Sequence, residues 1–453
     1  MNKLISLIFA MLICSLSISL VACDTDNNTT TAENEIITTV SNTTTADNTT
    51  TLPPVEEPIE CRHVEEIIAS RAPTTTSVGL TEGKKCSLCG KILKQQYIVS
   101  AIPVIDGLEY LLNDDGSSYS VIGIGNITGS KVVIPDKYKG LPVTAIGREA
   151  FLNCENIKKI DIPSGITYIG RSAFEGCSGL TEIILPDTVT EMGIAVFMKC
   201  DGLTSVRLSK GLTRIEHYTF SQCENLVFVE IPDGVKELGY SIFVKCKSLT
   251  GVKLPTGISN IPENTFFGCV SLASITIPEG VEKIESHAFE NCQALEEMYI
   301  PSTLRALGRD SRFNVFTGCD RVKGYYVDPD NPYFYSVDGV LYYDDILIRY
   351  PCGNERATFT VPNGIVEIDD GAFNNCEYLE EVILPSSLAD IGNRVFYSCD
   401  NLKSVYIPIG VTRIWYDAFA KCPSLTITCA TSRKLDDWDS RWVDSEATVI
   451  WGR

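Results

Sequence analysis

Residues 173–193 run Ala-Phe-Glu-Gly-Cys-Ser-Gly-Leu-Thr-Glu-Ile-Ile-Leu-Pro-Asp-Thr-Val-Thr-Glu-Met-Gly, and this stretch decides the fold. Its Phe-x-x-Cys unit recurs eleven times along the chain, and all but two of the intervals are 23 residues. A fixed interval of this length is typical of a repeat solenoid. The repeated phenylalanines are Phe151, Phe174, Phe197, Phe220, Phe243, Phe266, Phe289, Phe316, Phe373, Phe396 and Phe419.

Each repeat has the pattern of one coil. Leu180-Thr181-Glu182-Ile183-Ile184-Leu185 alternates as Leu-x-x-Ile-x-Leu, which predicts a half-buried strand that Pro186 ends. Phe174 and Cys177 stand three apart, so a short helical turn would direct both side chains inward. A single coil cannot bury its apolar face alone, so the coils must stack and pair their strands in a parallel sheet, about 4.8 Å apart.

The eleven repeat cysteines are expected to form one ladder in this core. Buried cysteine behaves as a small apolar side chain, and we favour this interpretation over a disulfide, a metal ligand or a reactive thiol. Coil spacing exceeds the usual Cβ separation of a disulfide, about 3.8 Å, which favours free thiols.

The register resembles that of the BspA-like family of bacterial leucine-rich-repeat proteins. The resemblance rests on two motifs, Ile-x-Ile-Pro at the end of the strand and Ile-Gly-x-x-Ala-Phe-x-x-Cys after it. It extends from about Gly107 to the C-terminus. It implies an N-terminal cap and first partial coil over 99–148, a leucine-rich-repeat solenoid over 149–430 and a C-terminal cap over 431–453. The resemblance says little about function, because the motif residues face inward and family members described as adhesins share them with members of unknown role.

One insertion interrupts the repeats at about 328–350. Asp338-Gly339 between strand-forming residues predicts a hairpin, which we expect to protrude from the stack. Phe359-Thr360-Val361-Pro362 restores the register of the strand.

The N-terminal segment is predicted to be a lipoprotein signal peptide, residues 1–23. Lys3 and an uncharged apolar stretch precede Leu20-Val21-Ala22-Cys23, which resembles a bacterial lipobox and implies that Cys23 is lipidated. The alternative is an uncleaved signal anchor. Residues 24–60 carry twelve Thr, eight acidic residues and no Lys or Arg, so we expect a disordered tether.

Residues 61–98 are expected to form a small Cys/His module. Cys61 and His63, with Cys86 and Cys89, have the spacing of a structural zinc site with four protein ligands. The alternatives are a Cys86–Cys89 disulfide and a module without metal. Four protein ligands would leave no open position for chemistry, so no cofactor for activity is expected.

Nothing in the sequence predicts catalysis. Of three histidines, His217 and His287 are three coils apart, roughly 15 Å, and no nucleophile, metalloprotease or phosphate-loop motif occurs. The net charge of −20 argues against a nucleic-acid partner.

The side chains between the two inward strand positions are expected to face outward in one column. Its early part alternates in charge, from Arg207 to Glu230 to Lys253, which predicts cross-strand pairing. Its later part is aromatic and aliphatic, and Tyr299, Tyr326, Ile383 and Tyr406 are the candidate ligand-binding residues. The alternative is an aromatic ladder that only stabilises its own sheet.

The sequence therefore predicts a binding or adhesion module, lipid-anchored at the extracellular face of a bacterial membrane, with an extracellular protein or glycan as partner. The alternatives are a passive scaffold or spacer and, less favoured, a hydrolase whose site the sequence does not reveal.

Overall fold

The computed structural model describes residues 65–71, 79–88, 91–94, 96, 98–99, 107–308 and 315–453. The predicted signal peptide with Cys23 and the predicted tether lie outside these residues. The part of the chain that the structure describes contains no helix of the length and apolarity needed to cross a bilayer.

A small antiparallel module precedes the repeats. Its three-stranded sheet has the order β1 (Glu65–Ile68), β3 (Gly83–Cys86), β4 (Ile92–Lys94). A second pair joins β2 (Gly79–Leu80) to β5 (Ile98–Val99).

Two ladders of short parallel strands build the solenoid. Most coils contribute two strands, and not the one that the sequence predicts, whereas the coil of Phe266 contributes only an isolated bridge at Thr276 to the first ladder. One strand of most coils, which follows Phe-x-x-Cys where the coil has that unit, belongs to the ladder that we call sheet A. Hydrogen bonds join its strands as four consecutive sheets. It consists of β8 (Lys131–Val133), β11 (Lys159–Asp161), β13 (Glu182–Ile184), β15 (Ser205–Arg207), β17 (Phe228–Glu230), β19 (Gly251–Lys253), β22 (Glu297–Ile300), β24 (Gly324–Val327), β28 (Thr358–Thr360), β30 (Glu381–Ile383), β32 (Ser404–Ile407), β34 (Thr426–Cys429) and β35 (Thr448–Trp451).

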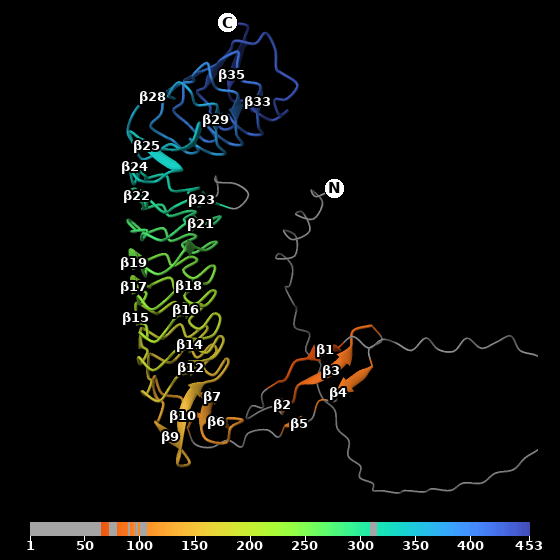
Figure 1. The fold of residues 1–453 in the computed structure, drawn as a ribbon, viewed down its shortest axis with the longest axis vertical. Helices are drawn as coiled ribbons and strands as arrows, with labels where there is room; N and C mark the ends of the chain where they lie inside the picture. The colour runs from red at the N-terminus through yellow and green to blue at the C-terminus, as the bar shows by residue number, and fades with distance from the viewer. Residues whose placement is uncertain are drawn as a thin grey trace, which may run out of the picture. The chain divides into compact units, whose positions relative to one another are not determined.

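The second strand of each coil forms the ladder that we call sheet B. It consists of β10 (Leu141–Ile146), β12 (Tyr168–Ile169), β14 (Glu191–Met192), β16 (Arg214–Ile215), β18 (Glu237–Leu238), β20 (Asn260–Ile261), β21 (Lys283–Ile284), β23 (Ala306–Leu307), β29 (Glu367–Ile368), β31 (Asp390–Ile391) and β33 (Arg413–Ile414). Figure 1 shows β15, β17 and β19 along one side of the stack, with β14, β16 and β18 along the other.

The Phe-x-x-Cys segment is a chain of turns and not the short helix that the spacing predicts. Around Phe174, Ser172 and Gly176 have left-handed backbones, with φ of 53° and 73°. The same alternation flanks every other repeat phenylalanine for which both flanking positions are described. A left-handed residue breaks a right-handed helix. It also turns alternate amides toward the next coil, where the amide of Phe174 donates to the carbonyl of Val196 at 3.0 Å. Hydrogen bonding between coils therefore replaces hydrogen bonding within a helix.

The repeat phenylalanines form the predicted inward ladder. All eleven side chains are buried, and from Phe151 to Phe316 successive ring centroids lie 5.2–6.0 Å apart with nearly parallel planes. After the insertion Tyr350 takes the place of a phenylalanine and stacks on Phe373 at 5.0 Å.

All the repeat cysteines except the half-buried Cys154 are buried beside this ladder, and most are free thiols, as predicted. Their thiols also donate hydrogen bonds, because each from Cys177 to Cys319 reaches the carbonyl oxygen of the phenylalanine one coil earlier at 3.0–3.2 Å. The prediction was wrong for Cys376, which forms a disulfide with Cys352. In the preceding coil Tyr350-Pro351-Cys352 is one residue shorter than Phe-x-x-Cys, which brings the two Cα atoms to 4.4 Å.

The insertion forms the predicted hairpin, with β25 (Phe334–Val337) and β26 (Val340–Tyr343) joined by Asp338 and Gly339 at φ of 52° and 81°. It does not protrude. Leu341 belongs to the core before the insertion, whereas Val340 and Tyr342 belong to the core after it. β27 (Ile346–Arg349) then pairs with β29 and restarts sheet B. The insertion therefore joins two hydrophobic cores.

Other residues close the ends of the stack. At the N-terminal end β6 (Glu109–Leu112) pairs antiparallel with β7 (Tyr119–Gly123), which pairs with β10, while β9 (Lys137–Tyr138) also pairs with β10. At the C-terminal end Trp442 packs on Phe419 with ring centroids 5.7 Å apart.

Candidate functional site

Sheet A presents two outward columns of side chains. The predicted column is exposed, as at Ile184, Tyr299 and Tyr406. A second column, which was not predicted from the sequence, consists of the residues just before the first inward position and includes Glu182 and Phe228. Strict alternation along the strand would have revealed it.

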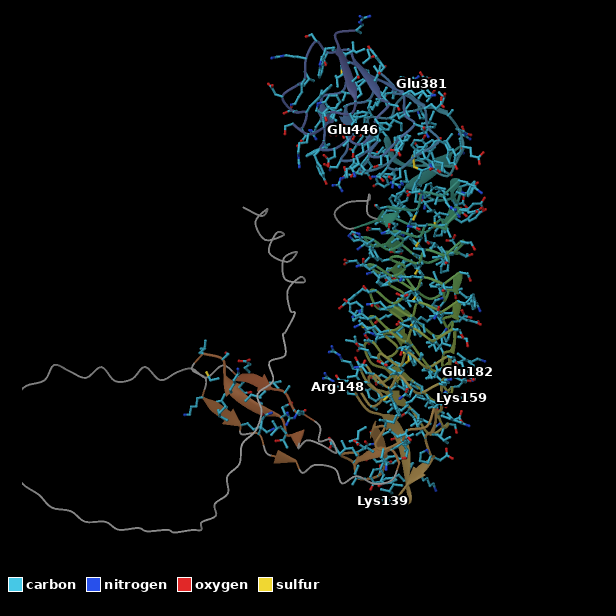
Figure 2. All side chains as sticks on the ribbon, turned by 180° about the vertical axis from the view of Figure 1, so that it is seen from behind. Lys139, Arg148, Lys159, Glu182, Glu381 and Glu446 are labelled. Atoms are coloured by element: carbon cyan, nitrogen blue, oxygen red, sulfur yellow. A yellow bond between two sulfur atoms is a disulfide. The ribbon has the colours of Figure 1, made fainter. Side chains whose placement is uncertain are left out.

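The N-terminal half of sheet A is charged and largely self-paired. Lys159 binds Glu182 at 2.9 Å, and Figure 2 shows the two side by side. Lys253 binds Glu230 at 2.6 Å, as the alternation of charge predicts. Arg207 instead binds Asp187 in the turn after β13, at 3.0 Å. Exposed pairs of this kind add little stability, but they leave little net charge for a ligand.

A groove of about 550 Å³ lies on this charged half. Phe228, which is 50% exposed, lies in it between positions occupied by Ser205 and Gly251. Its charged lining is balanced and consists of Arg207, Lys210, Glu230 and Asp233.

Tyr299 and Tyr326 form the aromatic pair that the register predicts. They occupy paired positions on β22 and β24, and their ring centroids are 5.1 Å apart. The Tyr299 hydroxyl donates to Glu297 at 3.0 Å, and this hydrogen bond, with the charge of Glu297, raises the pKa of Tyr299. The Tyr326 hydroxyl lies over Gly324, where a Cβ atom would come within 2.7 Å of it. Each hydroxyl thus lies over the residue two positions earlier in its own strand. Both side chains stay exposed, at 55% and 40%.

A second groove, of about 310 Å³, borders the tyrosine pair. We call it the tyrosine groove. Besides the two tyrosines its lining consists of Ile277, Glu279, Ile300, Pro301, Val327, Asp328 and Pro329. Asp328 and Pro329, just after β24, form one wall, and the hairpin tip does not line the groove. The carbonyl of Gly339 at that tip instead accepts the amide of Tyr325. A concave corner therefore lies beside the tyrosines, formed without the hairpin tip.

Ile383 and Tyr406 form a separate exposed pair. They are paired residues of β30 and β32, and they are 46% and 47% exposed. Their sheet, β28-β30-β32-β34-β35, is not hydrogen-bonded to β24. The structure therefore brings the four candidate residues together as two pairs.

The predicted zinc site falls mostly outside the described residues. Cys61, His63 and Cys89 lie outside them, and only Cys86 is described, as a buried side chain at the end of β3. The described residues contain no group of three or more His, Cys, Asp or Glu side chains that could hold a metal ion. Zinc binding by this module stays a prediction.

Among the described residues, the two histidines do not converge. His217 accepts the amide of Tyr240 at Nδ1, whereas His287 bonds to Glu290 in its own turn. Burial raises the pKa of the Cys177 thiol to about 12 and that of Cys223 well above its usual value, so the ladder thiols stay protonated. What the geometry offers is a rigid, grooved surface.

Stacked coils, inward Phe and Cys ladders and an outward strand face define a leucine-rich-repeat solenoid. The chain belongs to the family of the BspA type leucine rich repeat region, whose model matches six copies over residues 144–227, 190–323 and 351–436.

Solved structures of bacterial proteins share the fold. A leucine rich cell surface protein of Faecalibacterium prausnitzii is 26% identical, with a TM-score of 0.54, and the match covers 78% of this chain and 95% of that protein. A leucine-rich repeat protein of Bacteroides ovatus is also 26% identical, with a TM-score of 0.55 and coverage of 77% and 99%. A comparison with curated proteins found no significant match.

Proposed function

We propose that the protein is a surface-displayed binding module that recognises an extracellular protein or glycan through sheet A. The observation that carries the proposal is the half-exposed Tyr299–Tyr326 pair beside the tyrosine groove. Tyrosine offers a large contact area with little rotamer freedom to lose, and a rigid sheet adds little further ordering cost on binding. Membership of a repeat family whose solved relatives include a cell surface protein supports this role.

The proposed site is tested by replacing both tyrosines with alanine in a ligand screen. The protein is applied to glycan and extracellular-matrix protein arrays, and the affinity of each hit is measured for both forms. Loss of the aromatic contact area should weaken binding by about 2 to 4 kcal/mol. Melting temperatures should change little, because both side chains are exposed.

The paired control replaces Arg207 and Lys253 with alanine on the charged half, which should chiefly alter the association rate and its salt dependence. If every hit binds the tyrosine variant as tightly as the parent, the site lies elsewhere. If no array ligand binds the parent and the tyrosine variant is less stable than the parent, the results favour the passive scaffold, in which the tyrosines only support their sheet.

We also propose that a lipid on Cys23 anchors the protein at the outer face of the membrane, on the strength of Leu20-Val21-Ala22-Cys23. Replacing Cys23 with Ser removes the thiol that would be acylated. Cells that express the variant should therefore lose fatty-acid labelling of the protein and accumulate unlipidated precursor. Continued labelling of the variant would exclude this anchor.

A further inference from the structure

The two grooves on sheet A differ in charge. The larger groove carries two basic and two acidic side chains, and its Arg207 and Glu230 are each held in an ion pair. The tyrosine groove carries Glu279 and Asp328 and no basic residue among the described residues that line it. The tyrosine groove therefore has a net negative charge for a ligand to neutralise, which the larger groove lacks.

The carboxylates at the tyrosine groove are held by neutral donors. Glu279 accepts from the amide and hydroxyl of Ser302, at 3.2 and 2.9 Å. Asp328 accepts the amide of Asp330 at 2.9 Å. Neither forms an ion pair with a described residue, and the same holds for Glu297, which holds the Tyr299 hydroxyl. These contacts orient the carboxylates, and no described basic side chain compensates their charge.

Aromatic rings beside uncompensated carboxylates favour a cation. A cationic side chain gains from the electron-rich faces of tyrosine rings, and arginine combines such stacking with paired hydrogen bonds to a carboxylate. A chain of net charge −20 also attracts basic partners over a longer range and repels acidic ones.

We propose that the tyrosine groove receives an arginine side chain from a basic segment of a partner protein, with the side chain against Tyr299 and Tyr326 and its guanidinium within reach of Glu279 and Asp328. This inference rests on the proposed function and narrows it to a protein ligand with an exposed cation. The 310 Å³ of the groove is at the lower end of the sizes of small-ligand pockets, about 300 to 1,000 Å³, and suits one side chain.

The test uses two labelled octapeptides, one that alternates glycine with arginine and one in which neutral citrulline replaces arginine. Fluorescence anisotropy with the full chain at low and physiological salt should detect binding of the arginine peptide only. Y299A/Y326A should weaken it roughly tenfold or more, whereas Y299F/Y326F keeps the rings and should bind as the parent does. E279Q/D328N should weaken it roughly fivefold or more and reduce its salt dependence.

The matched control is E230Q/D233N, which changes the net charge equally but in the larger groove, and it should leave binding unchanged. Equal weakening by this control, equal binding of the citrulline peptide, or full binding by Y299A/Y326A would overturn the inference. If the arginine peptide does not bind while an array glycan binds and is lost in Y299A/Y326A, the proposed binding surface stands and the cationic partner is wrong. If the array ligands instead bind Y299A/Y326A as tightly as the parent, the proposed function is contradicted.

Discussion

Replacing Phe220 with alanine is expected to lower the free energy of unfolding by about 3 to 5 kcal/mol, because the substitution leaves a cavity in the middle of a stacked ladder. The Phe220 ring is fully buried and lies between those of Phe197 and Phe243, at 5.6 and 5.5 Å. Neighbouring coils cannot close the gap, since hydrogen bonds between coils fix their spacing. Urea denaturation followed by circular dichroism measures the change.

The matched control is Phe228→Ala, which deletes the same kind of side chain from the exposed face of β17, the strand that follows Phe220 in the same coil. Phe228 is half-exposed, so its loss should cost less than about 1 kcal/mol. A second control, His217→Ala, removes one partly exposed hydrogen-bond acceptor and should also cost about 1 kcal/mol or less. Equal midpoints for Phe220→Ala and Phe228→Ala would contradict the register of the coil.

The sequence predicted the ladders because spacing alone places them. A 23-residue interval and the alternation around Ile183 dictate which side chains face inward, whatever the backbone does between them. The conformation of the turns could not be predicted from the sequence. Its left-handed residues include Lys199, Gln222 and Lys245, whose side chains have no preference for the left-handed region of backbone angles. Hydrogen bonds to the next coil impose it, and they exist only in the stacked state. The strands of sheet B were missed because two residues are too short for an alternating pattern.

The candidate site was predicted in part for a similar reason. Alternation along the strand placed Tyr299 and Tyr326 outward, and equal repeat spacing placed them on neighbouring strands. The wall of the groove depends on the path of the chain after Val327, which follows no repeat. The same limit explains the missed disulfide, because the prediction assumed Phe-x-x-Cys in every coil, whereas Tyr350-Pro351-Cys352 has one residue fewer between the aromatic residue and the cysteine.

Reducing the Cys352–Cys376 disulfide is expected to lower the stability of the block that follows the insertion by about 3 kcal/mol, since a 24-residue separation sets the chain entropy that the crosslink removes from the unfolded state. Both cysteines belong to the core after the insertion, and so do Trp438 and Trp442. All four tryptophans of the chain lie beyond residue 400. Tryptophan fluorescence during urea denaturation therefore reports on this block alone.

Three proteins compared with and without a thiol reductant isolate the effect of the crosslink. The parent should lose stability on reduction, and C352A/C376A should be indifferent to the reductant. Cys399→Ala removes a buried ladder thiol from the next coil without touching the crosslink, so it should keep the full dependence on reductant. In a repeat array each coil contacts only its neighbours, so reduction should destabilise the block after the insertion more than the block before it. The urea midpoint from circular dichroism, which averages over both blocks, should therefore shift less than the midpoint from tryptophan fluorescence. If reduction leaves the urea midpoint of the parent's tryptophan fluorescence unchanged, the stacking of Tyr350 on Phe373 stabilises the start of this block without help from the disulfide.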